Sequence, residues 1–192
     1  MRIGLFGGSF NPIHNGHVML GRQILEHARL DEVWYMVSPQ NPLKAQATDL
    51  APEEVRLHLT QIALEGEQGL KASDYEFHLP RPSYTWNTLQ HLRKDYPNDE
   101  FVLIIGGDNW DHFDKWAHCE DILREYEIVV YPRSGAEVRV PSGKAKGVKV
   151  LSLPLFQVSS TEVRQMIREG RNLACLVPDA VAEEVEKYSL YR

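Results

Sequence analysis

The sequence predicts an α/β fold of one domain, with a twisted parallel sheet, helices on both faces and a small helical part at the C-terminal end. Two observations carry this prediction. Short apolar stretches typical of buried strands alternate with longer stretches whose apolar residues recur at helical spacing. Two of the apolar stretches end in paired glycines, Gly7-Gly8 and Gly106-Gly107. The length of 192 residues suits a single domain over residues 1–192.

The first third of the chain predicts a strand, a helix and a second strand. Residues 1–6 (MRIGLF) are apolar and stop at a pair of glycines, which favours a short strand. Residues 17–28 carry apolar side chains at roughly helical spacing. Residues 33–37 (VWYMV) predict a buried strand, and the polar, proline-interrupted segment 39–50 predicts a loop.

The middle of the chain continues the alternation. Residues 52–64 predict a helix, because a proline in its first turn is followed by acids that the helix dipole favours. Residues 72–79 are expected to form a strand and residues 85–94 a helix. Residues 101–105 (FVLII) predict a buried strand that stops at two glycines.

The last third repeats the pattern. Residues 121–126 predict a helix and residues 127–131 a strand. Residues 134–147 are rich in Gly, Ser, Lys and Ala and predict a mobile surface loop. The chain is then expected to form a strand and two helices, at 148–153, 160–168 and 178–188. In such sheets ligands bind at the carboxyl ends of the strands, near a switch in strand order.

Composition narrows the class of protein. Hydrophobic residues make up 43% and charged residues 25%, as in ordinary globular proteins. No apolar run reaches the ~20 residues of a membrane span, and the start lacks the pattern of a signal peptide, so a cytoplasmic protein is expected. Cys119 and Cys175 lie far apart and are expected to be free thiols. The net charge of −6 argues against nucleic-acid binding. The sequence does not decide whether the protein is a monomer or a homo-oligomer.

The strongest functional signal is the first strand-to-helix turn, GGSFNPIHNGH. Glycines allow a ligand close to the backbone, and the free N–H groups of a helix start favour an anion. His14 and His17 lie three residues apart, so at the helix entry both can face one side. Two imidazoles there can donate hydrogen bonds to phosphate oxygens in a transition state. The alternative is a pair of ordinary histidines on a tight turn.

This turn resembles the His-x-Gly-His signature of the nucleotidyltransferase superfamily of α/β phosphodiesterases, which has a Rossmann-like fold. The resemblance implies that His14 and His17 bind and polarise the phosphates of a nucleoside triphosphate. It also implies that residues around the signature contact ATP, namely Gly7, Gly8, Ser9 and Phe10, together with Gly106 at the second glycine pair.

A second signal lies about 145 residues after the His14 to His17 segment, in VSSTEVR. Ser159 or Ser160 is a good N-cap, and Arg164 can reach back from the first turns of the helix toward an anion at its start. The alternative is a well-capped helix and no more. The string resembles the superfamily's Ser-Ser-Thr-x-x-Arg signature, which implies a catalytic Arg164. The same resemblance implies contacts to ATP by Val158, Ser159, Ser160 and Thr161.

Three strings in the middle of the chain bear on the second substrate. PRPSYTWNTL is a loop-to-helix entry with free N–H groups and hydroxyls, suited to a carboxylate; a simple N-cap is the alternative. Asp108 follows a buried strand, where a carboxylate can accept hydrogen bonds from ribose, or can cap a helix. Trp116 can stack on a pyridine ring or pack in the core. Arg133, at a strand end, can pair with a monophosphate or lie in solvent.

Together these strings resemble the bacterial nicotinate mononucleotide adenylyltransferase family across nearly the whole chain. The resemblance implies that the backbone around Tyr84 and Thr85 recognises the nicotinate carboxylate and that Trp116 stacks on the ring. It implies that Arg133 holds the phosphate region of the mononucleotide and that Asp108 contacts the adenosine ribose. Lys44 matches a proline-rich basic loop near the active site.

The chain departs from the family pattern at a few positions. Asn11 stands where Asp is usual, and Ser9 stands where Thr is usual. Gly107 replaces Ala, Trp110 replaces an aliphatic residue, and Leu43 occupies the place of a usual His. These differences leave the implied chemistry in place and bear on fine ligand geometry.

The activity that this resemblance implies is transfer of AMP from ATP to nicotinate mononucleotide, with release of pyrophosphate. Mg²⁺ is expected to arrive with the ATP phosphates, and no carboxylate cage for it is found in the sequence. Phosphopantetheine, nicotinamide mononucleotide and flavin mononucleotide are the alternative acceptors. A nucleotide-binding sensor without turnover is the alternative from another class.

Overall fold

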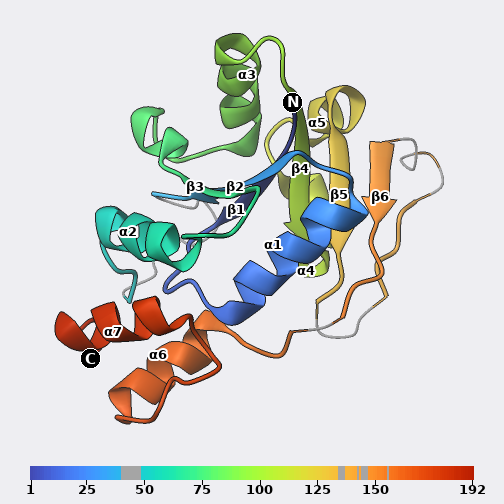
Figure 1. The fold of residues 1–192 in the computed structure, drawn as a ribbon. Helices are drawn as coiled ribbons and strands as arrows, with labels where there is room; N and C mark the ends of the chain where they lie inside the picture. The colour runs from blue at the N-terminus through green and yellow to red at the C-terminus, as the bar shows by residue number, and fades with distance from the viewer. Residues whose placement is uncertain (40–48, 134–136, 142, 144–146, 155) are drawn as a thin grey trace.

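The computed structural model describes residues 1–39, 49–133, 137–141, 143, 147–154 and 156–192. Its centre is a sheet of six parallel strands in the order β3-β2-β1-β4-β5-β6 (Figure 1). The strands are β1 Arg2–Gly8, β2 Glu32–Val37, β3 Leu70–Ser73, β4 Glu100–Gly106, β5 Glu127–Tyr131 and β6 Val148–Val150. The predicted parallel α/β fold is confirmed.

Alternate residues of the strands point into two apolar layers, one on each face of the sheet. Phe6 and Tyr35 pack into one layer, whereas Ile3 and Leu103 pack into the other. Both layers are needed because a parallel sheet buries both of its faces. Each fully buried side chain of this size contributes roughly 1.5–3 kcal/mol of transfer free energy.

Helices cover the two faces separately. The first layer is closed by α1 Asn15–His27, α2 Glu53–Ala63, α6 Ser160–Arg168 and α7 Asp179–Lys187. The second is closed by α3 Thr85–Asp95, the short α4 Gly107–Trp110 and α5 Cys119–Glu125. The 3-10 helices η2 Tyr75–His78 and η3 Phe113–Lys115 are also present among the described residues. In Figure 1 the orange and red C-terminal helices lie together below α1 and α2, which is the small helical part that the sequence predicts.

Two of the predicted strands are wrong in extent. The strand expected at 72–79 is β3 Leu70–Ser73 followed by η2, because the Tyr75 N–H donates to Ser73 Oγ (3.3 Å) and turns the chain. The strand expected at 148–153 stops at Val150, although Leu151 and Leu153 are buried. The elements α4 and η3 were not predicted, since three or four residues carry no periodic signal.

The order of the strands places the site. From β1 the chain goes first to β2 on one side, and later enters β4 on the other side. The carboxyl ends of β1 and β4, with Gly8 and Gly106, therefore flank the switch point where ligands of such sheets bind. In the described part of the chain no helix is long and apolar enough to cross a membrane. Cys119 and Cys175 are unpaired thiols, as expected.

Candidate active site

The two predicted histidines begin α1 and cap each other. His14 is the N-cap, and its Nδ1 accepts a hydrogen bond from the His17 N–H (3.3 Å). In return the Nδ1 of His17 accepts from the His14 N–H (3.2 Å). The rings stack with their centroids 3.6 Å apart. This is a capping box built from imidazoles, where Ser or Thr and Glu are usual.

The reciprocal caps fix the tautomers of both rings. Because each Nδ1 accepts a backbone N–H, the Nε2 atom is left to carry the ring proton and to donate. His14 is 4% exposed, and burial, helped by the positive charge of Arg133, lowers its pKa from 6.5 to about 4. His14 is therefore a neutral N–H donor at pH 7. A neutral donor can hold a developing charge without first exchanging a proton with water.

Burial of His14 makes the fold sensitive to acid. Since its folded pKa lies below the unfolded value, its contribution to stability is full above pH 6.5 and disappears as pH falls toward 4. A shift to about 4 corresponds to about 3 kcal/mol. We expect His14→Asn, which keeps a capping acceptor, to lose less stability than the wild type between pH 7 and pH 4.5. Urea unfolding midpoints at the two pH values measure this. Equal losses would assign the acid sensitivity to other groups.

Gly16 leaves room for the His14 ring. A Cβ atom at this position would lie 3.0 Å from His14 Nδ1 and 3.1 Å from its Cε1, tighter than normal contact. We expect Gly16→Ala to push the ring aside by a few tenths of an ångström and to lower kcat by roughly tenfold. Steady-state kinetics, with Asn15→Ala in the same turn as a control of nearly unchanged turnover, test this. Full activity of Gly16→Ala would show that the ring position is not critical.

The second predicted signature meets the first at the start of α6. Ser159 is the N-cap of α6 and accepts from the Glu162 N–H (3.1 Å). The hydroxyl of Ser160 donates to the Pro12 carbonyl oxygen (2.9 Å), and Arg164 Nη1 donates to the Asn11 carbonyl oxygen (2.9 Å). The starts of α1 and α6, 145 residues apart in sequence, are thus joined at one edge of the sheet (Figure 1). Two helix starts side by side form a strong anion site.

The guanidinium of Arg164 already holds an anion. Its Nε and Nη2 lie 2.9 and 2.7 Å from Asp49 Oδ2, and its side chain is only 12% exposed. Nη2 also donates to the hydroxyl of Thr161 (3.4 Å). Asp49 was not singled out by sequence reasoning, because an acid beside a loop carries no signal. A triphosphate that binds Arg164 therefore competes with the Asp49 carboxylate.

A buried arginine that the sequence analysis missed supports the phosphate turn. Arg56 in α2 is 1% exposed. Its Nη1 donates to the carbonyl oxygens of Ser9 (2.7 Å) and Ser38 (2.8 Å), and its Nε donates to that of Ala51 (2.8 Å). Burial lowers the pKa of the guanidinium. The sequence did offer one signal for Arg56. Helical spacing places this arginine on the inner face of the predicted helix 52–64.

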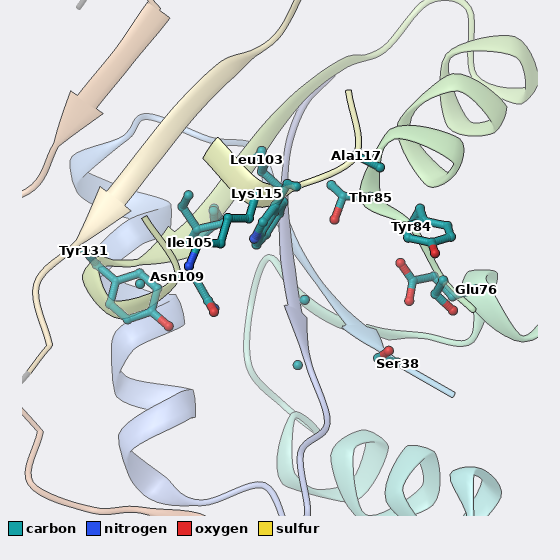
Figure 2. Close-up of a pocket in the computed structure, with 16 residues that line it drawn as sticks. Ser38, Glu76, Tyr84, Thr85, Leu103, Ile105, Asn109, Lys115, Ala117 and Tyr131 are labelled. Carbon is teal, nitrogen blue, oxygen red and sulfur yellow. The ribbon is translucent and has the colours of Figure 1, made fainter. Parts of the chain in front are cut away.

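A pocket opens beside the phosphate turn, between the carboxyl ends of β1 and β4 and the start of α3 (Figure 2). Its lining combines backbone glycines, hydroxyls, a carboxyl group and aromatic rings, a set of groups that suits a polar ligand with a ring. In Figure 2 Glu76, Tyr84 and Thr85 lie on one side and Asn109 and Tyr131 on the other. The remaining polar and aromatic lining comes from Ser38, Ser83, Lys115 and Trp116, and Gly7, Gly8 and Gly106 provide backbone.

The pocket contains polar atoms without partners. Ser83 Oγ and Trp116 Nε1 are buried and have no hydrogen bond to the described residues. No side chain caps α3, because Tyr84 at its N-cap makes no such bond. Buried donors of this kind are normally satisfied, so the pocket is suited to a polar, anionic ligand. The structure brings together Tyr84, Thr85 and Trp116 as predicted.

Two further predicted residues pair with each other. Arg133 Nη1 lies 3.2 Å from Asp108 Oδ2, and both side chains are about half exposed. The pair lies next to Gly106. A Cβ atom added to this glycine would lie 2.6 Å from Asp108 Oδ1. An exposed pair contributes little to stability, so ligands can separate it at low cost. Neither side chain lines the pocket, but the positive charge of Arg133 is close enough to lower the pKa of His14, so the pair lies near the phosphate turn.

Some of the predicted site residues do not have side chains that are available to a ligand. The ring of Phe10 is buried and packs edge-on against His17, with centroids 5.1 Å apart, so only its backbone is open to a ligand. Val158 packs against the first apolar layer. Lys44 lies outside the described residues. Glu76 and Lys115 line the pocket but were not predicted, and nothing in their spacing marks them.

A parallel sheet of this order, with an anion site at its switch point and a second pocket beside it, is the architecture of a nucleotide-binding α/β protein. A family model described as cytidylyltransferase-like matches residues 5–166. Probable nicotinate-nucleotide adenylyltransferases from two bacteria are similar over nearly the whole chain. The protein from Bacteroides thetaiotaomicron is 45% identical over 98% of this chain and 92% of its own length. The protein from Bacteroides fragilis is 48% identical, over 96% and 90%.

The chain belongs to the nicotinate-nucleotide adenylyltransferases of the cytidylyltransferase-like family. A solved structure has the same fold: the nicotinic acid mononucleotide adenylyltransferase of Plasmodium falciparum complexed with NaAD. Its TM-score is 0.81 at 20% identity, with 99% of this chain and 97% of that chain covered. The Rossmann-like fold and the family that the sequence resembles are confirmed.

Proposed function

We propose that the chain transfers the AMP part of ATP to nicotinate mononucleotide, giving nicotinate adenine dinucleotide and pyrophosphate in NAD biosynthesis. The observation that carries the proposal is the contact between two ligand sites: the joined starts of α1 and α6 form a phosphate site, and the pocket before α3 opens beside it. The two cysteines of the chain, Cys119 and Cys175, are free thiols, which suits a protein of the reducing cytoplasm.

The reaction depends more on groups that stabilise the charge on the phosphoryl oxygens than on a general base. An oxygen of the acceptor's phosphate forms a bond to the α-phosphorus of ATP, and the bond from that phosphorus to the bridging oxygen of pyrophosphate breaks. The attacking oxygen is already anionic. The Nε2–H groups of His14 and His17, the helix starts and Arg164 stabilise the charge on the phosphoryl oxygens, and the pocket aligns the acceptor.

A divalent metal ion, which we propose is Mg²⁺, accompanies ATP. Within the described ranges there is no group of three His, Cys, Asp or Glu side chains that could hold a metal ion. Mg²⁺ prefers phosphate and water oxygens, so the triphosphate itself would carry it into the site. When bound, the ion neutralises part of the phosphate charge and the charge of the leaving pyrophosphate.

The acceptor is assigned from the pocket. The uncapped start of α3 at Tyr84 and Thr85 offers backbone N–H groups to the nicotinate carboxylate. Trp116 lines the same pocket and offers an aromatic face to the pyridine ring. Arg133 would hold the acceptor phosphate and Asp108 the adenosine ribose, once the two side chains separate. Ser159 and Thr161 would act beside Ser160 and Arg164 on the β- and γ-phosphates.

The test is pyrophosphate release with ATP and Mg²⁺, offering nicotinate mononucleotide, nicotinamide mononucleotide and phosphopantetheine in parallel. We expect a strong preference for the nicotinate compound. Equal use of acid and amide would remove the proposed carboxylate recognition at α3. Preference for phosphopantetheine would mean that the acceptor is wrong, and binding of ATP without turnover would indicate a sensor.

A further inference from the structure

Glu76 is a carboxyl group in the acceptor pocket with no role in the proposed reaction. It comes from η2 and lines the pocket beside Tyr84 and Thr85 (Figure 2). Ser83 and Trp116 line the same pocket. One of its oxygens, Oε1, accepts a hydrogen bond from the buried hydroxyl of Thr88 (2.9 Å). No ion pair joins Glu76 to a cation among the residues that the structure describes.

The charged and titratable groups around Glu76 are few. Lys115 of η3 is the cation of the pocket lining, and the phenol of Tyr84 stands at the entry of α3. On its own helix, His78 and Asp74 form an exposed pair, 3.4 Å apart, that faces solvent. From α3 the contact is the uncharged Thr88. Burial therefore dominates and raises the pKa of Glu76 to about 7.

The position of this carboxyl has a direct consequence for a ligand that is itself a carboxylate. If the nicotinate group binds at the start of α3, it lies in the same pocket as Glu76. Two ionised carboxylates at close range repel, and one of them then takes up a proton. A protonated Glu76 would donate its O–H to the nicotinate oxygen. An ionised Glu76 would instead accept an N–H from a carboxamide.

We propose that Glu76 sets the preference of the pocket between a pyridine carboxylate and a pyridine carboxamide, by donating a hydrogen bond to the first when protonated and accepting one from the second when ionised. Glu76 is then a specificity-determining residue. The inference rests on the proposed function, because it takes the acceptor ring to lie against Trp116 with its substituent toward α3.

The test is the ratio of kcat/KM for nicotinate mononucleotide to that for nicotinamide mononucleotide, measured from pH 6 to pH 8.5. Both acceptors carry the same titrating phosphate, so its effect cancels in the ratio. We expect the wild-type ratio to fall roughly tenfold across this range, as the proton on Glu76 is lost. In Glu76→Gln, whose amide both donates and accepts at every pH, the ratio should be constant.

Matched variants separate this role from a structural one. Asp74→Asn removes one negative charge from the cap of the same 3-10 helix, where the side chain is 55% exposed, and should keep the wild-type pH dependence. Thr88→Val keeps the volume but removes the hydrogen bond that favours the ionised form, so the fall should move to higher pH. This second variant tests the proposal if Glu76→Gln does not fold.

The outcomes are distinct from those of the proposed function. A pH-independent ratio in the wild type, or the same slope in wild type and Glu76→Gln, would overturn the role of Glu76. An equal loss of kcat/KM with both acceptors in Glu76→Gln, leaving the ratio at its wild-type value at every pH, would also overturn it. No turnover with either acceptor would instead remove the proposed function. Binding of each mononucleotide alone, followed by tryptophan fluorescence, should show the same pH trend.

Discussion

Replacing His17 with alanine lowers kcat by roughly two to four powers of ten, the expected result if its Nε2–H holds the charge of the transition state. The KM values should change far less, because a transition-state donor contributes little to ground-state binding. Pre-steady-state and steady-state pyrophosphate release measure the effect. The variant also loses the hydrogen bond from the His14 N–H to His17 Nδ1 and the stacking of the two rings, which adds to the loss.

The matched control is His27→Ala, at the last turn of the same helix. Within the described ranges this exposed imidazole bonds to the carbonyl oxygen of Gln23 (2.8 Å), at the end of α1 away from the phosphate turn. It should keep wild-type turnover. A folded His17→Ala variant with unchanged kcat would remove His17 from the chemistry, and far-UV circular dichroism of the whole variant would show whether misfolding explains a loss.

Replacing Arg164 with alanine lowers kcat/KM for ATP by roughly a hundredfold, because a charge-assisted phosphate contact is lost from a largely buried position. The KM for nicotinate mononucleotide should remain close to the wild-type value. Loss of the guanidinium also frees the Asp49 carboxylate, whose negative charge then faces the incoming phosphates. Steady-state kinetics with varied ATP measure the change.

Arg168→Ala serves as the control for this prediction. Arg168 lies one turn further along α6, is 51% exposed and reaches Asp49 only at 4.0 Å. Its loss should change kcat/KM for ATP little. If Arg164→Ala and Arg168→Ala behave alike, general positive charge rather than a specific contact binds the triphosphate. The double variant Arg164→Ala with Asp49→Ala should recover part of the loss if repulsion by Asp49 contributes.

The sequence predicts well those strands and helices whose signals lie within a short stretch of chain. The strand at 127–131 and the helix at 160–168 have the predicted bounds, because apolar strands and capped helices carry local signals. The strand at 72–79 was overextended, since apolar residues of a 3-10 helix can mimic alternation. Edge strands such as β6 end where pairing with β5 ends, which only the assembled sheet decides.

The same distinction holds for the site. His14, His17 and the Ser159-to-Arg164 string were found because they form compact motifs at helix starts. Asp49 and Glu76 contact residues distant in sequence, Arg164 and Thr88, so no spacing identifies them. Their positions in the site come from the packing of separate segments, which only the structure shows.

The buried Arg56 has a consequence for how the two substrates meet. A single nitrogen, Nη1, connects the carbonyl of Ser9 in the phosphate turn to that of Ser38 at the rim of the acceptor pocket. Because both carbonyl oxygens accept a hydrogen bond from the same nitrogen, the two loops are held at a fixed distance from each other. In-line transfer depends on keeping the attacking oxygen within a few tenths of an ångström of its path. The guanidinium thus acts as a spacer that sets the distance between donor and acceptor before either arrives.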